Sequence, residues 1–105
     1  MKIVGIAACT AGIAHTYMAQ EKLTRAAEKL GHTAKIETQG TIGVENELTQ
    51  QEIAEADVVI LAVDVKVSGE ARFKGKTVIR VGTAAAIKNP VELLRKIEKA
   101  LEADA

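Results

Sequence analysis

The chain has 105 residues, of which 48% are hydrophobic, and this is enough for one domain with a single core over residues 1–105. Its 14 basic and 14 acidic side chains balance without any basic block, which excludes the cationic surface that nucleic-acid binding needs. No apolar run approaches the roughly 20 residues that cross a bilayer, and a strand begins too early to leave space for a signal peptide. With one cysteine, the chain is expected to be a soluble protein of the reducing cytoplasm.

Four short runs of apolar and β-branched residues predict strands at 2–8, 34–38, 57–63 and 77–81. The first and third runs are almost continuously hydrophobic. This pattern is typical of strands that are covered on both faces, as in a parallel sheet.

Three helices are predicted between and after these strands. The first covers residues 14–30 and ends before a glycine. Thr49 and Glu52 form a capping box that starts a short helix ending near Glu55, and Pro90 takes the first position of the last helix. The apolar stripes that bury the first and last helices are Ala19, Leu23, Ala26 and Leu30, and Val91, Leu94, Ile97 and Leu101.

The alternation of strands and helices predicts an α/β fold with right-handed crossovers. We expect a three-layer sandwich in which helices cover both faces of an open, four-stranded parallel sheet. Numbering the predicted strands along the chain, their order is 2-1-3-4. Ligands of such sheets bind outside the carboxyl ends of the strands, where the order reverses, which here is the end of the first strand.

Cys9 lies at that point, where the first strand runs into the loop that opens the first helix. A helix start presents unpaired N–H groups and the positive end of its dipole, which favour a nucleophilic thiolate and hold anions. Gly12 permits a tight backbone path that directs several amides inward. We therefore predict that Cys9 is the catalytic nucleophile and attacks a phosphoryl group, with no metal or cofactor. The predicted phosphate-binding residues are Thr10, Ala11, Gly12, Ile13, Ala14, His15 and Thr16.

Each of these residues also has an ordinary structural interpretation. A lone cysteine after a strand is often a buried small hydrophobe, and a threonine at a helix start often caps it. His15 is then an exposed residue of the first helical turn, although it can also bind the thiolate or the phosphate. His32, in a connecting segment, is expected at the surface, and Asp64, Lys66 and Glu70 are expected to form a solvated rim.

Other functions are compatible with a phosphate-binding loop. Cysteine phosphatases use Cys-x5-Arg, but the residue six positions after Cys9 is His15, which disfavours hydrolysis. Reductase chemistry is disfavoured because the sequence has no second cysteine. A non-catalytic binder of FMN or phosphate is the main alternative, although Tyr17 and Phe73 are the only aromatic residues and flavin sites usually need more.

The chain resembles the fructose-type IIB component of the bacterial sugar phosphotransferase system (PTS). That family carries the loop Cys-Pro-x-Gly-Ile/Val-Ala-His-Thr, which residues 9–16 match except that Thr10 replaces the proline. The resemblance continues through residues 35–49, which include Glu-Thr-Gln-Gly at 37–40, and through 56–60 and 72–76, so it covers essentially the whole chain.

This resemblance implies a phosphoryl relay. A phosphohistidine on a IIA partner phosphorylates Cys9, and the phosphocysteine passes the group to a sugar, typically fructose or a relative, held by the membrane-embedded IIC component. Residues 37–40 are implied to close over the site after the second strand. Thr10 makes the loop less rigid than proline does but adds an N–H and a hydroxyl, so activity is expected to be retained.

Overall fold

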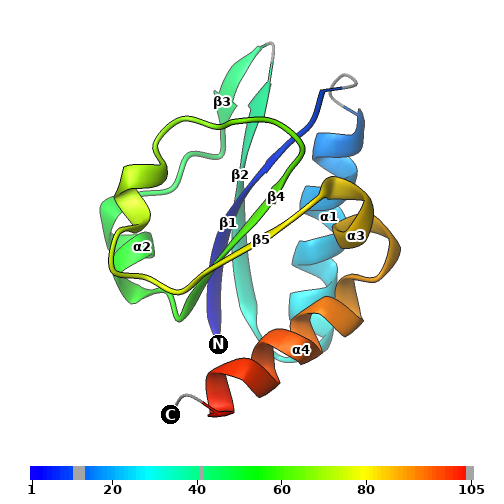
Figure 1. Ribbon diagram of the computed structural model, residues 1–105, viewed down its shortest axis with the longest axis vertical. Coiled ribbons are helices and arrows are strands. Elements are labelled where there is room, and N and C mark those ends of the chain that lie inside the picture. Colours follow the sequence, from blue (N-terminus) through cyan, green and yellow to red (C-terminus); the bar gives the residue numbers. More distant parts are fainter. Residues whose placement is uncertain (11–13, 41, 104–105) are drawn as a thin grey trace.

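The computed structural model describes residues 1–10, 14–40 and 42–103, and it contains one twisted sheet between two layers of helices (Figure 1). The strands are β1 (Lys2–Ala8), β2 (Thr33–Gly40), β3 (Gly43–Glu45), β4 (Val58–Val63) and β5 (Val78–Val81). The helices are α1 (Ala14–Lys29), α2 (Gln50–Glu55), α3 (Thr83–Lys88) and α4 (Pro90–Ala103), with a 3-10 turn, η1 (Glu70–Phe73).

The sheet has the order β3-β2-β1-β4-β5. The strands β2, β1, β4 and β5 are parallel to their neighbours and lie in the relative order that we predicted. The prediction of a four-stranded, wholly parallel sheet is wrong, because β3 adds a fifth, antiparallel strand beside β2. The pattern of β3 gave no hydrophobic signal, since all three of its residues are exposed at the edge of the sheet.

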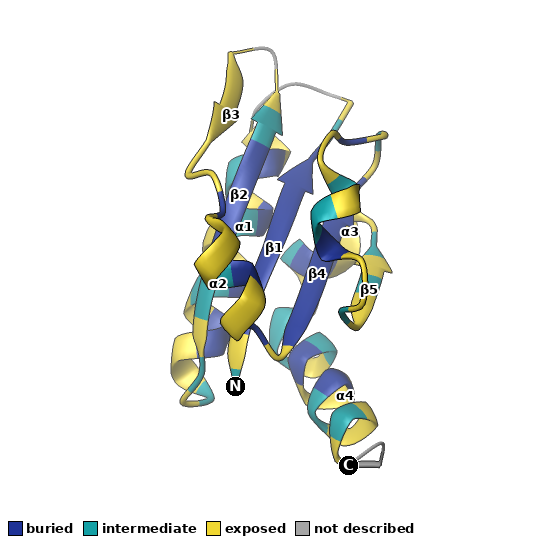
Figure 2. Cartoon of the chain, turned by 90° about the vertical axis from the view of Figure 1, so that its left-hand side faces the viewer, coloured by how far each residue is buried: buried dark blue, intermediate teal, exposed yellow. Residues whose placement is uncertain are grey.

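Helices cover both faces of the sheet, as expected. The helices α1, α3 and α4 pack on one face, around a cluster that includes Ala7, Leu23 and Ala62. On the other face, α2 and η1 pack around a cluster that includes Ile53 and Phe73. Figure 2 shows α2 in front of the sheet and the continuous burial of β1 and β4 between the two layers.

Local sequence signals account for most element boundaries. The β1 strand has the predicted bounds, and the other predicted strands are right to within two residues at each end. Thr49 accepts the Glu52 N–H while the Glu52 carboxylate accepts the Thr49 N–H, so the capping box of α2 is confirmed. Pro90 begins α4, whose predicted face is buried at Leu94 and Ile97.

The α3 helix is another element that the sequence failed to indicate. Its N-cap residue, Gly82, makes no side-chain capping bond, so there was no local start signal. The cap comes instead from Asp64, whose carboxylate accepts the Thr83 N–H at 3.0 Å and the Thr83 hydroxyl. Asp64 lies 19 residues before Thr83, so the sequence around the start of the helix does not reveal this cap.

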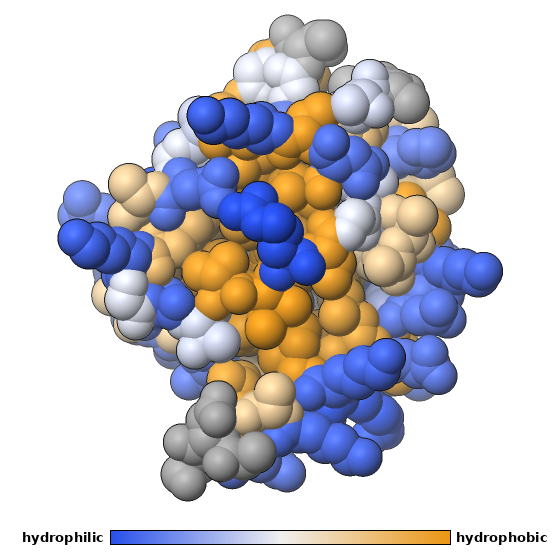
Figure 3. Space-filling model, viewed as in Figure 1, coloured by the Kyte–Doolittle hydropathy of each residue, from blue (hydrophilic) through white to orange (hydrophobic). Residues whose placement is uncertain are grey.

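The β5 strand forms the second edge of the sheet. Val78 on this strand is 39% exposed. In the face seen in Figure 3, apolar side chains gather in the middle and hydrophilic ones lie around them.

Among the described residues, none of the helices is long and apolar enough to span a membrane.

Candidate functional site

Cys9 directly follows β1 at the carboxyl end of the sheet, and its side chain is partly exposed. The hydroxyl of Thr16, in the first turn of α1, donates a hydrogen bond to the Cys9 Sγ at 3.1 Å. Thr16 is 4% exposed, so its hydroxyl is fixed under the sulfur by packing. A fixed hydroxyl donor stabilises negative charge on the sulfur.

The structure places only part of the predicted phosphate-binding loop. Thr10, Ala14 and His15 are exposed, and Ala14 begins α1 as expected. The predicted roles of Ala11, Gly12 and Ile13 fall outside the described residues. The amide cradle therefore stays a prediction, whereas the contact of Thr16 with the sulfur is observed.

Asp64 adds a carboxylate beside Cys9 that we had assigned to the solvated rim. It follows β4, the neighbour of β1, and its N–H donates to the carbonyl of Ala8 at 2.9 Å. The side chain is exposed but not merely solvated, because it caps α3 through Thr83. The two hydrogen bonds from Thr83, and to a lesser extent the charge of His15, lower the pKa of Asp64 below its usual value.

Glu37, in contrast, points away from the Cys9 face. Its carboxylate is 1% exposed and forms a bidentate ion pair with Arg72 of η1, at 2.9 and 3.0 Å. It also accepts the Leu48 N–H at 3.0 Å and the side-chain amide of Gln39 at 2.9 Å. Burial raises the pKa of Glu37, but the hydrogen bonds from Arg72, Gln39 and Leu48 outweigh it, so the pKa lies below its usual value.

Gln39 fixes the chain that follows β4. Its side-chain amide donates to the carbonyl of Ser68 and accepts the Ser68 N–H, both at 2.9 Å, as a neighbouring strand would. Residues 37–40 belong to β2 itself, so the expectation that they follow the second strand is wrong, and their closing over the site stays a prediction. The apolar and polar alternation of this segment was too weak to show that the strand continued to Gly40.

The hairpin of β2 and β3 borders the site on its other side. The Tyr17 hydroxyl, on α1, donates to Glu45 of β3, and this bond raises the pKa of Tyr17. The hollow between these elements is lined by residues that include Thr16 and Thr38, and its volume is about 10 Å³. That space is smaller than one water molecule occupies in the liquid.

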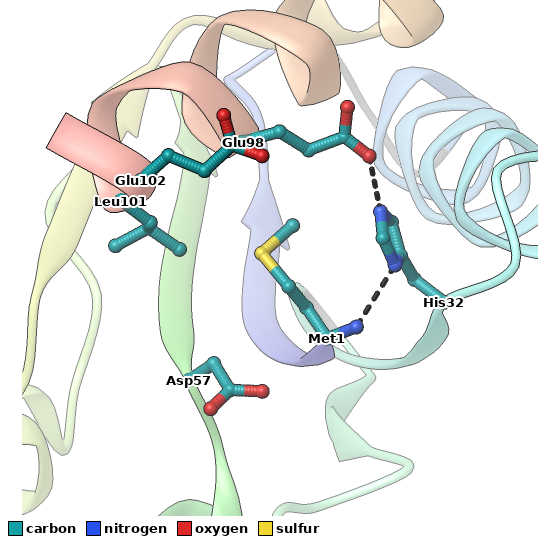
Figure 4. Close-up of a pocket in the computed structure, with 6 residues that line it drawn as sticks. All are labelled: Met1, His32, Asp57, Glu98, Leu101 and Glu102. Carbon is teal, nitrogen blue, oxygen red and sulfur yellow. Dashed lines mark hydrogen bonds and ion pairs between the residues drawn. The ribbon is translucent and has the colours of Figure 1, made fainter. Parts of the chain in front are cut away.

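A larger hollow, of about 590 Å³, lies at the opposite end of the sheet (Figure 4). It is lined by Met1, His32, Asp57, Glu98, Leu101 and Glu102. The His32 ring lies between the Met1 amine, 2.9 Å from Nδ1, and the Glu98 carboxylate. The side chain of His32 is 13% exposed, so the expectation that it lies on the surface is wrong. This hollow is at the amino ends of the strands, away from Cys9.

Comparisons with known proteins agree with this architecture. The family described as "PTS system, Lactose/Cellobiose specific IIB subunit" matches residues 4–102. The "PTS system fructose-like EIIB component 2" of Escherichia coli K12 is 50% identical over 97 residues, 92% of each chain. The "PTS system fructose-specific EIIABC component" of Bacillus subtilis is 47% identical over 99% of this chain, which spans 16% of that larger protein.

A solved structure confirms the fold. The solution structure of the Enzyme IIB subunit of the PTS system from Escherichia coli K12 superposes with a TM-score of 0.91. Its sequence is 39% identical, and the match covers 98% of this chain and 95% of the other. Sequence and fold therefore agree, and the chain belongs to the fructose-type IIB components of the sugar phosphotransferase system.

Proposed function

We propose that this IIB domain carries a phosphoryl group on the sulfur of Cys9 and passes it to a sugar. In the first step the Cys9 thiolate attacks the phosphorus of a phosphohistidine on a IIA domain. The S–P bond forms, the N–P bond breaks, and the imidazole leaves with the electron pair. In the second step a sugar hydroxyl attacks the same phosphorus, the S–P bond breaks, the thiolate leaves, and the hydroxyl proton passes to solvent.

The hydrogen bond from Thr16 to the Cys9 sulfur is the observation that carries this proposal. This hydrogen bond stabilises negative charge on the sulfur. The thiolate carries that charge both when it attacks as the nucleophile and when it departs as the leaving group. Phosphoryl transfer depends mainly on positioning and charge stabilisation, so a few residues at the end of a strand are sufficient for it. Cys9 is also partly exposed, as a carrier that meets two partners in turn requires.

The partners are inferred from domain organisation in relatives. The fructose-specific protein of Bacillus subtilis carries A, B and C units in one chain, and the fructose-like protein of Escherichia coli carries B and C. We infer a IIA donor and a IIC acceptor, with this domain at the cytoplasmic face of the membrane beside IIC. We infer that the IIC partner holds the sugar, fructose or a relative, because the fructose-like protein of Escherichia coli joins B and C units in one chain.

Phosphorylation of the chain by a phosphorylated IIA domain tests the first step. The intact mass of the wild type should rise by one phosphoryl group, and Cys9→Ser should not accept it because the hydroxyl is a far weaker nucleophile at neutral pH. His32→Gln is the matched control, because His32 lies at the opposite end of the sheet, and His15→Gln tests whether that histidine carries the group instead. Label that persists in Cys9→Ser but disappears in a histidine variant would contradict the proposal.

A further inference from the structure

Asp64 and Cys9 are opposite one another at the ends of two neighbouring strands. Ala8 pairs with Val63 in the parallel register of β1 and β4, so Cys9 and Asp64 are the next positions along. The hydrogen bond from the Asp64 N–H to the Ala8 carbonyl shows that pairing continues to this point. Strands in a sheet are about 4.8 Å apart, so the two residues are immediate neighbours.

Both side chains lie on the same face of the sheet. Ala7 and Ala62, two positions earlier, belong to the cluster beneath α1 and α3. Side chains alternate between faces, so Cys9 and Asp64 also belong to that side. The observed contacts agree, because the Cys9 sulfur accepts from Thr16 on α1 and the Asp64 carboxylate accepts from Thr83 on α3.

The Asp64 carboxylate is held as a fixed negative charge. Each of its oxygens accepts a hydrogen bond from Thr83, one from the N–H and one from the hydroxyl. A Cβ added at Gly82 would lie 3.2 Å from the Asp64 Oδ1, so the backbone of that residue approaches closely and limits movement of the carboxylate. These bonds lower the pKa of Asp64, which keeps the group ionised at neutral pH.

We infer that Asp64 destabilises the phosphoryl group on Cys9 and thereby makes the phosphocysteine a better donor to its next acceptor. This inference rests on the proposed function. A phosphoryl group carries about −1.5 to −2 charges at neutral pH, and a fixed anion on the neighbouring strand repels it. Because Asp64 is exposed and solvent screens the interaction, the effect on the transfer equilibrium is roughly three- to tenfold. Positive charge on His15, which interacts electrostatically with Asp64, would act in the opposite direction.

The equilibrium of phosphoryl exchange between a phosphorylated IIA domain and this chain measures the effect directly. Asp64→Asn removes the charge but keeps an oxygen that accepts the Thr83 N–H. We expect it to raise the equilibrium constant for phosphorylation of Cys9 roughly three- to tenfold. The ratio between the two proteins should shrink as salt concentration rises, because salt screens an exposed charge but does not remove a difference in packing.

Two further variants separate this effect from a structural role. Thr83→Val keeps the charge and removes one capping bond, so its equilibrium constant should stay within about twofold of the wild type. In a His15→Gln background, Asp64→Asn should still raise the constant. A rise that disappears in that background would overturn the inference, because Asp64 would then act only by orienting His15.

The outcomes distinguish this inference from the function on which it rests. If the wild type accepts no phosphoryl group, the proposed function fails. If the wild type and Asp64→Asn are both phosphorylated with the same equilibrium constant, only the role of Asp64 is overturned. If Asp64→Asn does not fold, Asp64→Ser removes the same charge and gives the same comparison.

Discussion

The carboxyl end of the sheet carries two polar clusters, one on each face, and they are built in opposite ways. On the α1 side, Cys9 is partly exposed and Asp64 is exposed, and both accept hydrogen bonds from threonines, Thr16 and Thr83. On the α2 side, Glu37 is buried, and its two oxygens accept hydrogen bonds from Arg72, Gln39 and Leu48. A buried ion pair with every group satisfied holds segments together, whereas a partly exposed sulfur that accepts a hydrogen bond is suited to reaction. Polar residues that lie near Cys9 in the sheet therefore need not belong to the reactive cluster.

The largest effect should follow from breaking the buried cluster. Arg72→Leu leaves the Glu37 carboxylate buried without its counter-ion, which should lower the free energy of unfolding by about 3 kcal/mol. The measurement is urea denaturation followed by circular dichroism. Arg25→Leu is the matched control, because Arg25 pairs with Glu21 at the surface, with side chains 76% and 60% exposed, and should cost below about 1 kcal/mol.

The same comparison should depend on pH. The folded-state pKa of Glu37 lies below its unfolded value of about 4.5, so the ion pair stabilises the protein above that pH and the contribution disappears as pH falls through the folded pKa. The difference between wild type and Arg72→Leu should therefore be largest near neutral pH and shrink in acid. A difference that stays constant from neutral pH to below the folded pKa would show that the ion pair is not its source.

An intermediate effect, on rate rather than stability, should follow from changing the reactive cluster. Thr16→Val removes the donor to the Cys9 sulfur and should slow phosphoryl acceptance from a IIA domain roughly tenfold. Single-turnover transfer measures it. Thr24→Val, on the same helix, removes only a hydroxyl bond to the carbonyl of Gln20 and should leave the rate within about twofold. Equal rates for the two variants would remove Thr16 from the mechanism.

The smallest effect should come from changing Gln39. This change tests whether Gln39 belongs to the buried cluster around Glu37 or to the reactive cluster around Cys9. Gln39→Met removes the bonds to Ser68 and the bond to the Glu37 carboxylate, which should cost about 1 kcal/mol of stability because Arg72 and Leu48 still satisfy Glu37 and the rest of the site is partly exposed. The transfer rate should change less than about twofold. A tenfold loss of rate with unchanged stability would mean instead that the Gln39 side chain contacts the phosphoryl group, as the family resemblance implied. Gln51→Met, which breaks an exposed bond to Glu55, is the control.

Much of the site was readable from the order of residues in the chain. The continuous apolar runs of β1 and β4 predicted central parallel strands, and this pattern alone placed Cys9 at the crevice where the strand order reverses. Thr16 was predicted either to bind the phosphate or to cap the helix, and in the structure its hydroxyl donates to the Cys9 sulfur. Asp64 is exposed, as expected, but its role as the cap of α3 was missed because nothing in the sequence of residues 64–71 indicates which helix it caps.

The buried strands, the capping box of α2 and the proline start of α4 depend on near neighbours in the chain, so they could be predicted from the sequence. The contacts between polar groups could not, because the bonds of Glu37 to Arg72 and of Asp64 to Thr83 join residues 35 and 19 positions apart. Their partners are chosen by strand register and crossover geometry. For the same reason β3 and α3 were not predicted from the sequence. The β3 strand buries none of its three residues, and the N-terminus of α3 is capped by a residue outside the helix rather than by its own N-cap side chain.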